Sequence, residues 1–368
     1  MLSLPLSEIA QLIQQCQWQE AKSLLAHWRS QYPDEPQLKL LEAHLAYAMG
    51  NVSEAEAMFR EILKSQAPAS VWAEARQGLR QIEEDEFKRR QQRAKEIAES
   101  SAEQGLGFLA LLPVPPENVS LRSRAVERLA RILRTDLYTA KFKLPTRHLK
   151  IIRLGAIAEL QAHGEELQQA QIPAVWISKQ AIEQIPLKQV RYFEVLGLGE
   201  VRAIHHQGDT RFALAEVSAR VEGVLPTYGN VFDLNAKYQI IRREQMLDRV
   251  RICDFHLPQR QLILRFHDSN YQFSQGVQVP VSQPLPNLKP TVHQRWQALM
   301  TWFASAMPHS RIYDHFSHFQ DMLMMYPDFV KEITPRIELC RPKPQLVDNC
   351  FEIYSATLFL IQQRGLAL

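Results

Sequence analysis

Histidine and aspartate side chains come together twice in the sequence at spacings that could bind a metal or support catalysis. In residues 253–268, CDFHLPQRQLILRFHD, Asp254 and His256 alternate along an expected strand, and His267 and Asp268 end the next one. A carboxylate and imidazoles on adjacent strands are ligand types that zinc uses. The competing interpretation is that both histidines lie at hairpin ends and are satisfied by neighbouring groups. We predict no metal here, and keep a pocket around Asp254, His256 and His267 as an enzyme hypothesis.

The other groupings offer less chemistry. His315 and His318 lie about one helical turn apart with Asp314 close by, but no third set of ligands is near in the sequence. His205 and His206 fall next to each other on an expected strand, so their side chains face opposite ways. The chain contains no phosphate-binding glycine loop, no HExxH motif and no GxSxG motif. We therefore predict a protein without catalytic residues, cofactors or metal ligands.

Basic residues concentrate in one short segment. Residues 121–153 hold ten Lys or Arg and two Asp or Glu, whereas the whole chain has a formal net charge of +3. A helix is expected over 121–134, and its 100° rotation per residue places four arginines on one side, opposite the apolar stripe. Together with the basic residues that follow, the predicted anion-binding surface consists of Arg124, Arg128, Arg131, Arg134, Lys141, Lys143, Arg147, Lys150 and Arg153.

Three classes of partner could bind this surface: an acidic protein, the phosphate backbone of RNA or DNA, or an anionic membrane. The planar guanidinium of arginine suits carboxylates and phosphates alike. Nucleic-acid binding would also need exposed aromatic side chains for stacking, and only Tyr138 and Phe142 are nearby. In their context, LYTAKF, these two residues are at least equally good core residues. A solvated basic face without a partner is the remaining interpretation.

Length and composition favour a soluble globular protein of two or three domains. The chain has 368 residues, of which 46% are hydrophobic and 23% charged. No apolar run approaches the roughly 20 residues needed to cross a bilayer, and the first residues lack the cationic region of a signal peptide. The four cysteines are scattered, without a CxxC pair. We expect a cytoplasmic protein, with peripheral membrane contact as a second option.

The N-terminal part contains an internal repeat. The stretch CQWQEAKSLLAHWRSQYP at 16–33 returns as GNVSEAEAMFREILKSQAP at 50–68, and Ala21 and Ala55 lie 34 positions apart. A small residue at this place, an aromatic such as Phe59 four positions later, and prolines at the ends of the second helices resemble the tetratricopeptide repeat (TPR). The resemblance implies stacked helical hairpins whose concave face binds a segment of another protein.

The same resemblance places the partner-binding face on the first helix of each hairpin. The contacting positions are then Leu6, Ala10, Ile13, Gln37, Leu40, His44 and Tyr47. Three positions depart from the family pattern, because Lys39 and Glu42 stand where apolar residues are preferred and Cys16 stands where the second copy has Gly50. Residues 71–104 are expected to close the stack as a helix that continues into a polar spacer. The first domain is therefore predicted to span 1–104.

Beyond this domain the pattern changes to mixed helices and strands. Residues 105–187 alternate strands such as FLALLPV with helices around a short turn, TDLYTAKFKL. This order is similar to the C-terminal domain of ribosomal protein L7/L12 and to Clp adaptors, which implies a docking domain. Residues 188–310 contain seven short strands followed by an aromatic-rich helix, and resemble a pleckstrin-homology-like (PH-like) barrel that a helix closes. Residues 311–368 are expected to be helical.

Together these segments predict a multidomain α+β protein with TPR-like hairpins, a small α+β unit, a β-rich PH-like barrel and C-terminal helices. The stretch RVRICDFHLPQRQLILRFHDSNYQF also resembles uncharacterised cyanobacterial TPR proteins, which implies a role in a large complex such as a photosynthetic one. We predict a non-catalytic adaptor or assembly factor that binds protein partners through its repeats and its basic surface. The alternative is a nucleic-acid-binding regulator that uses residues 122–153.

Overall fold

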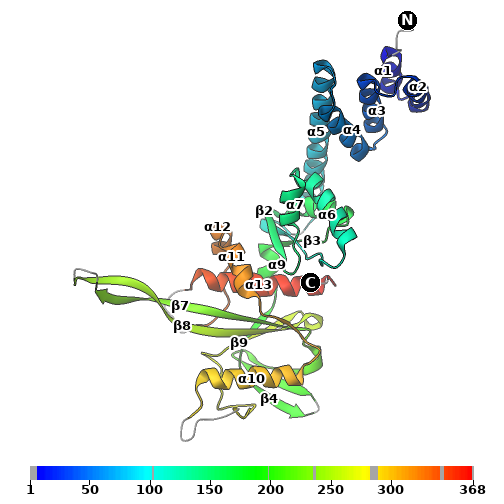
Figure 1. Cartoon of the computed structure of the whole chain (residues 1–368). Helices are drawn as coiled ribbons and strands as arrows, with labels where there is room; N and C mark the ends of the chain where they lie inside the picture. Colours follow the sequence, from blue (N-terminus) through cyan, green and yellow to red (C-terminus); the bar gives the residue numbers. More distant parts are fainter. Residues whose placement is uncertain are drawn as a thin grey trace. The chain divides into compact units, whose positions relative to one another are not determined.

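The structure, a computed structural model, describes residues 6–101, 103–197, 199–234, 238–281, 289–339 and 344–366. The chain divides into two compact units, Met1–Glu96 and Ile97–Leu368 (Figure 1). Among the described helices, none is both long enough and apolar enough to cross a membrane.

The first unit is built from helical hairpins. Its helices are α1 (Leu6–Gln14), α2 (Trp18–Gln31), α3 (Pro36–Ala48), α4 (Val52–Lys64) and α5 (Ala69–Ser100), the last of which continues beyond the unit. Ala21 lies fully buried in the core that α1, α2 and α3 share, and Ala55 lies fully buried in the core of α3, α4 and α5. Small residues at these places let neighbouring helices approach closely. The expected N-terminal helical hairpins are confirmed.

Two departures from the repeat pattern have physical consequences in the structure. Glu42 of α3 forms an ion pair with Arg29 of α2, so the charged residue has a partner in the adjacent helix. Gly50, between α3 and α4, has φ +83°, and Cys16, between α1 and α2, has φ +60°. Both turns therefore use the left-handed backbone region, which suits glycine and strains a residue that carries a Cβ.

The second unit begins with a small antiparallel sheet in the order β2-β1-β3. The strands are β1 (Leu106–Leu111), β2 (Lys150–Ala156) and β3 (Ala174–Ser178), and the helices of this part are α6 (Val119–Leu133), α7 (Leu137–Lys143), α8 (Ile157–Gln169) and α9 (Lys179–Gln184). The helix α7 stands where a turn was expected. The Asp136 carboxylate accepts a hydrogen bond of 2.9 Å from the backbone N of Thr139, and this cap begins the helix.

A larger mixed sheet follows, in the order β10-β7-β8-β9-β4-β5-β6. Its strands are β4 (Leu187–Gly197), β5 (Glu200–His205), β6 (Gly208–Ala213), β7 (Ala219–Leu234), β8 (Ile240–Leu257), β9 (Leu262–His267) and β10 (Arg311–Tyr313), with the short 3-10 helices η1 (Leu214–Glu216) and η2 (Pro258–Arg260) between them. No pairing between described residues joins β10 to β6, so the sheet is open. The predicted PH-like barrel is therefore wrong.

Burial of both faces explains why this sheet does not close. On β8, Ile252 packs on the face covered by α13 (Leu346–Gln363), and Phe255 packs on the face covered by α10 (Val292–Ala306) (Figure 1). A barrel has one interior face and one exposed face, whereas here a helix layer covers each side. Every residue of β9 is accordingly buried, although Arg265 and His267 interrupt its apolar sequence.

The helix α13 packs against several parts of the second unit within one hydrophobic core. Phe351 of α13 belongs to the same buried cluster as Ile177 of β3, Val221 of β7 and Phe319 of α11 (Phe316–Leu323). The short helix α12 (Pro327–Glu332) packs against α13 as well. The three segments expected at 105–187, 188–310 and 311–368 thus contribute to a common hydrophobic core, while their boundaries stay predictions.

The strands β7 and β8 continue past the rest of the sheet as a two-stranded ribbon (Figure 1). Outside the ribbon, β10 pairs only with Ala219–Val221 of β7, and β9 pairs only with Ile252–Leu257 of β8. Every residue of β8 from Ile240 to Arg249 is exposed. The ribbon therefore adds little to the core of the unit.

Candidate functional site

The predicted partner-binding positions of the helical hairpins lie on α1 and α3. Gln37 is exposed and Ile13 is half-buried, whereas Leu40 is 3% exposed and supports the surface from inside the core. The His44 ring makes an edge contact with the buried ring of Phe59 at a centroid distance of 5.1 Å. Of the seven predicted positions, Gln37 is thus the most accessible to a partner.

Tyr47 links α3 to α5 through its hydroxyl group, which donates a hydrogen bond to the Asp85 carboxylate. Burial, followed by this bond, raises the pKa of Tyr47 to about 12, and the bonds from Tyr47 and Gln81 lower the pKa of Asp85. Burial lowers the pKa of His44, against an opposite effect of Glu74. At neutral pH this surface therefore presents a neutral imidazole, a neutral phenol and a carboxylate.

The basic segment does not form one uniform surface. Arg128 donates hydrogen bonds to the carbonyl oxygen of Ala170 at 2.9 Å and to Oε1 of Gln171 at 2.7 Å. Arg153 forms an ion pair with Glu159 at 3.6 Å. These two arginines serve contacts within the fold, which the spacing of the sequence did not predict.

Three of the other predicted cations line a groove of about 830 Å³ between α7, the start of β2 and α11. These are Lys141, Arg147 and Lys150. The aromatic side chains of Tyr138 and Phe142 line the same groove, and they are 71% and 61% exposed. Interpretation of these two aromatics as core residues is therefore wrong. Because they lie four residues apart on α7, their rings meet edge to face at 4.6 Å.

The apolar part of this groove comes from a distant part of the chain. Met322 of α11 and Met325 just after it line the groove together with Leu144 and Leu149 of the segment between α7 and β2. Met325 is 65% exposed. The methionine cluster was interpreted from the sequence as packing or as an adaptable binding surface, but nothing local connects α11 to α7.

Three histidines meet near the edge of the groove. The His148 ring lies 4.4 Å from the ring of His315 and 5.3 Å from that of His318. Burial lowers the pKa of His148, and the neighbouring His315 and His318 lower it further. Within the described parts of the chain, no group of three His, Cys, Asp or Glu is arranged to hold a metal ion.

The residues of the enzyme hypothesis lie in the interior of the second unit. Asp254 and His256 are fully buried, and Arg265 beside them is 1% exposed. Two hydrogen bonds of 2.8 and 2.7 Å join the Arg265 guanidinium to the Asp254 carboxylate, and Glu352 of α13 binds the same guanidinium. This is a buried ion cluster that fastens α13 to the sheet.

The hydrogen bonds of His256 run in the wrong direction for nucleophilic catalysis. Gln362 donates to Nδ1 of His256, so Nε2 carries the proton and donates to the Ser355 hydroxyl, which in turn donates to Asp254. A catalytic histidine would instead accept the serine proton. The arrangement satisfies buried polar groups and offers no activated hydroxyl.

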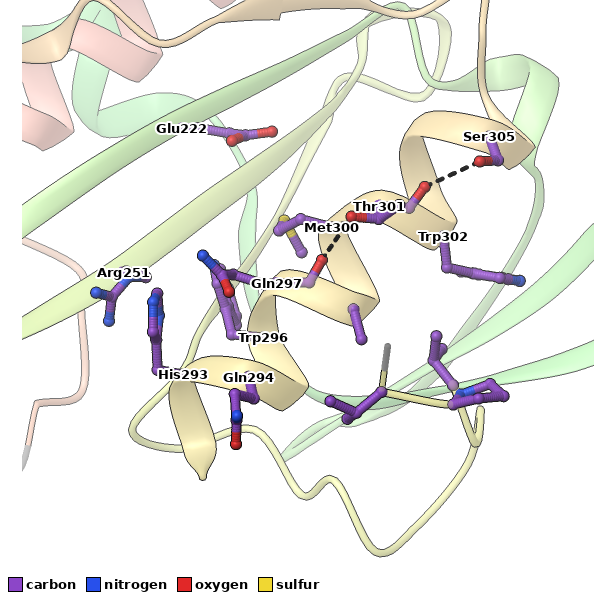
Figure 2. A pocket seen from close by; sticks show the side chains of 14 residues that line it. Glu222, Arg251, His293, Gln294, Trp296, Gln297, Met300, Thr301, Trp302 and Ser305 are labelled. Atoms are coloured by element: carbon purple, nitrogen blue, oxygen red, sulfur yellow. Dashed lines mark hydrogen bonds between the residues drawn. The ribbon is translucent and has the colours of Figure 1, made fainter. Parts of the chain in front are cut away.

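A second concave site, of about 690 Å³, lies beside α10. Figure 2 shows Glu222 and Arg251 on the strands β7 and β8, and His293, Gln297 and Met300 on the helix. Burial raises the pKa of Glu222, and the nearby Arg220 opposes this shift. Sequence analysis did not predict this pocket, because its walls come from elements that only the tertiary structure brings together.

Several polar groups of this pocket are engaged within the fold. The Thr301 hydroxyl donates to the carbonyl oxygen of Gln297 at 2.9 Å, and the Ser305 hydroxyl donates to that of Thr301 at 3.1 Å (Figure 2). Arg251 donates to Asp268 at 3.3 Å. Within the described lining of this pocket, neither the Thr301 nor the Ser305 hydroxyl is hydrogen-bonded to a basic side chain.

Comparison with known proteins bears on the helical hairpins. The family described as Tetratricopeptide repeat matches residues 12–79. The chain contains tetratricopeptide repeats. The match runs from α1 to the middle of α5, and therefore includes both copies of the 34-residue pattern. Searches of the curated proteins and of the solved structures gave no match.

The TPR match gives a general meaning to the surface of α1 and α3. Tetratricopeptide repeats mediate contacts between proteins, and the first helices of the hairpins form the concave face. Gln37, His44 and Tyr47 lie on such a helix, α3. Their role in binding stays a prediction, as does that of Ile13 and Leu40.

Proposed function

We propose that this chain is a non-catalytic adaptor that binds a protein partner through its tetratricopeptide repeats. The observation that carries the proposal is the TPR match over residues 12–79, which coincides with the hairpins of α1 to α5. Stacked hairpins of this kind bind an extended or helical segment of another protein. The exposed amide of Gln37 is the best-placed predicted contact.

The second unit supplies further surfaces, among them the basic residues of 122–153. An adaptor gains from such an arrangement, because a partner held at one weak contact has a raised effective concentration at the second contact. The resemblance to cyanobacterial TPR proteins extends the proposal to the assembly of a large complex such as a photosynthetic one. We place the protein in the cytoplasm, where its basic surface could also contact an anionic membrane.

Affinity purification of the tagged full-length chain from its native host, with and without nuclease, tests this function. Gln37→Arg should remove the specific protein partner, because it places a bulky cation on the binding face. Gln19→Arg is the matched control, since Gln19 is also exposed but lies on α2, the second helix of its hairpin.

A defined set of proteins that survives nuclease, and that Gln37→Arg but not Gln19→Arg removes, would support the adaptor function. Equal recovery with both variants would contradict the assignment of the binding face. Recovery that depends on RNA would favour the alternative, a nucleic-acid-binding regulator.

A further inference from the structure

We infer that the groove between α7 and α11 binds an acidic linear segment of a partner protein that carries an apolar anchor side chain. This inference deepens the proposed adaptor function and rests on it, since it gives the second unit a partner class of its own. Three features of the groove support it, namely an apolar floor, a positive rim and a preformed shape.

The floor of the groove is suited to an apolar anchor. Leu144 and Leu149 are buried beneath it, while Phe142 and Met325 expose 61% and 65% of their surface. Exposed aromatic and methionine side chains gathered in one concavity mark an interaction site rather than an ordinary surface. Methionine also adapts its shape to different anchors, because its side chain is unbranched and polarizable.

The rim of the groove is positive. Lys141, Arg147 and Lys150 line it, and Asp321 is the acidic residue among the lining side chains that the structure describes. No described carboxylate forms an ion pair with Lys141 or Arg147, so both cations can bind a partner's Asp or Glu. Complementary charge at the rim steers encounter and fixes the register of the bound segment.

The segment that carries these residues is held in place before any partner binds. The Arg122 guanidinium donates to three backbone carbonyl oxygens, those of Val114 at 3.0 Å, Pro145 at 3.2 Å and Leu144 at 2.9 Å. Lys150 donates to the carbonyl oxygen of Phe142 at 2.8 Å. A preformed groove loses little conformational freedom on binding, which favours a short peptide ligand.

The combination of features favours a peptide over a nucleic acid. Single-stranded nucleic acid would use a basic track along the backbone together with stacked bases. Here the apolar floor extends beyond the aromatic pair to Met322 and Met325, which offers an apolar anchor side chain contacts that stacked bases do not need. An acidic peptide with a leucine or phenylalanine anchor satisfies both the floor and the rim.

The test is a binding titration of the purified full chain with a short fluorescein-labelled peptide of Asp and Glu that carries Phe and Leu at helical spacing. Two further probes are the same peptide with alanine in place of Phe and Leu, and a labelled oligouridine. Arg147→Glu and Phe142→Ser alter the rim and the floor, and both side chains are exposed. Arg249→Glu on the β7–β8 ribbon is the control, with the same charge change at an exposed arginine.

We expect the acidic apolar peptide to bind, and each groove variant to weaken it about thirtyfold, at the lower end of the range found for interface hot spots. The alanine peptide should bind much more weakly, and Arg249→Glu should leave the affinity unchanged. Absence of binding, or an equal loss with Arg249→Glu, would overturn the inference. Tighter binding of oligouridine that displaces the peptide would also overturn it and assign the groove to nucleic acid.

This titration is independent of the partner of the repeats, because it uses the purified chain alone. If the peptide does not bind the groove, the purification result with Gln37→Arg still stands. If the purification finds no partner of the repeats, the peptide titration can still be interpreted.

Discussion

A Cβ atom on Gly78 of α5 would lie 2.5 Å from Cζ of the Phe59 ring in α4. Real Cβ atoms do not come this close to another heavy atom, so the two helices approach as nearly as glycine permits. The Phe59 ring is fully buried and makes an edge contact with His44 of α3. Helices α3, α4 and α5 are therefore coupled through one aromatic ring.

Gly78→Ala is expected to lower the free energy of unfolding by roughly 1–3 kcal/mol, the usual cost of overpacking a core. Alanine has a higher helix propensity than glycine, so this loss of stability would occur in spite of a favourable change in propensity. Urea unfolding of the full chain measures the effect. Gln77→Ala, at the exposed neighbouring position, should be neutral or slightly stabilising. An equal response of both variants would show that the Phe59 ring can move aside.

The two repeat turns provide a second test. Gly50→Ala should destabilise the protein by about 1 kcal/mol, because φ at this position is +83° and a Cβ is unfavourable there. The space around it is open, since no heavy atom lies within 4 Å of the place that a Cβ would take, so backbone strain is the whole effect. Cys16→Gly, at φ +60° in the equivalent turn, should not destabilise. Thermal unfolding that ranks the two variants the other way would contradict this reasoning.

The buried ion cluster should be sensitive to the loss of one charge. Asp254→Asn is expected to cost about 3 kcal/mol, because it leaves Arg265 with less compensation in the interior. Asp209→Asn provides a control, since Asp209 pairs with Arg211 at 3.7 Å on the surface and should contribute less than about 1 kcal/mol. If urea unfolding gives similar losses in the free energy of unfolding for both variants, the buried cluster contributes no more to stability than a surface ion pair.

Stability should fall as the pH falls below neutrality. Burial, with a further effect of Arg265, lowers the pKa of His256 to about 3 and that of His267 to about 4. In the unfolded chain both would titrate near pH 6.5, so below that value the unfolded state binds more protons. The stabilisation by the two neutral histidines is therefore complete above pH 6.5 and is lost as the pH falls toward 4.

Urea unfolding at several pH values measures this effect. Each histidine should contribute up to about 1.4 kcal/mol per pH unit between pH 6.5 and its folded pKa. His256→Gln should flatten the dependence, because glutamine does not titrate. A stability that rises on acidification would refute the neutral assignment of His256.

The β7–β8 ribbon should be dispensable for folding. Replacement of residues 228–247 by an Asn-Gly turn is expected to leave the thermal midpoint nearly unchanged, because Ile240 to Arg249 are all exposed and the cut lies outside the sheet core. A deeper cut that removes Leu225 and Val250, which are 0% and 5% exposed, should destabilise. A large fall in the thermal midpoint with the shorter cut would show that the ribbon stabilises the rest of the second unit.

Local patterns in the sequence predicted the N-terminal fold well. The 34-residue spacing of Ala21 and Ala55 is a local signal, and the hairpins it predicted are present. The strand and helix order of residues 105–187 was also close to the structure, apart from the additional helices α7 and α9. At α7, the cap at Asp136 begins a helix where the composition of TDLYTAKFKL indicated a turn.

Long-range packing was harder to predict. Strands β4 and β9 pair in parallel although they are far apart in the sequence, and this pairing belongs to an open sheet. The residue patterns of β8 and β9 predicted strands. They carried no information on whether a barrel interior or a pair of helices would cover them.

The candidate groove shows the same limit. Helical spacing predicted a helix over 121–134, which is present as α6, but Arg128 of this helix donates to Ala170 and Gln171. Met322 and Met325 complete the groove from a segment more remote in the chain. No periodicity within either segment could have predicted that they would meet.

The sequence alone determined the helical repeats, the position of the basic segment and the alternation of the small α+β unit, because these follow from contacts between near neighbours. Only the tertiary structure decided that Arg265 would meet Glu352 inside the second unit, and that Phe142 and Met325 would line one groove. The physical reason is that a local pattern tells which face of an element is apolar. The partner of that face depends on how all the elements fill the common core.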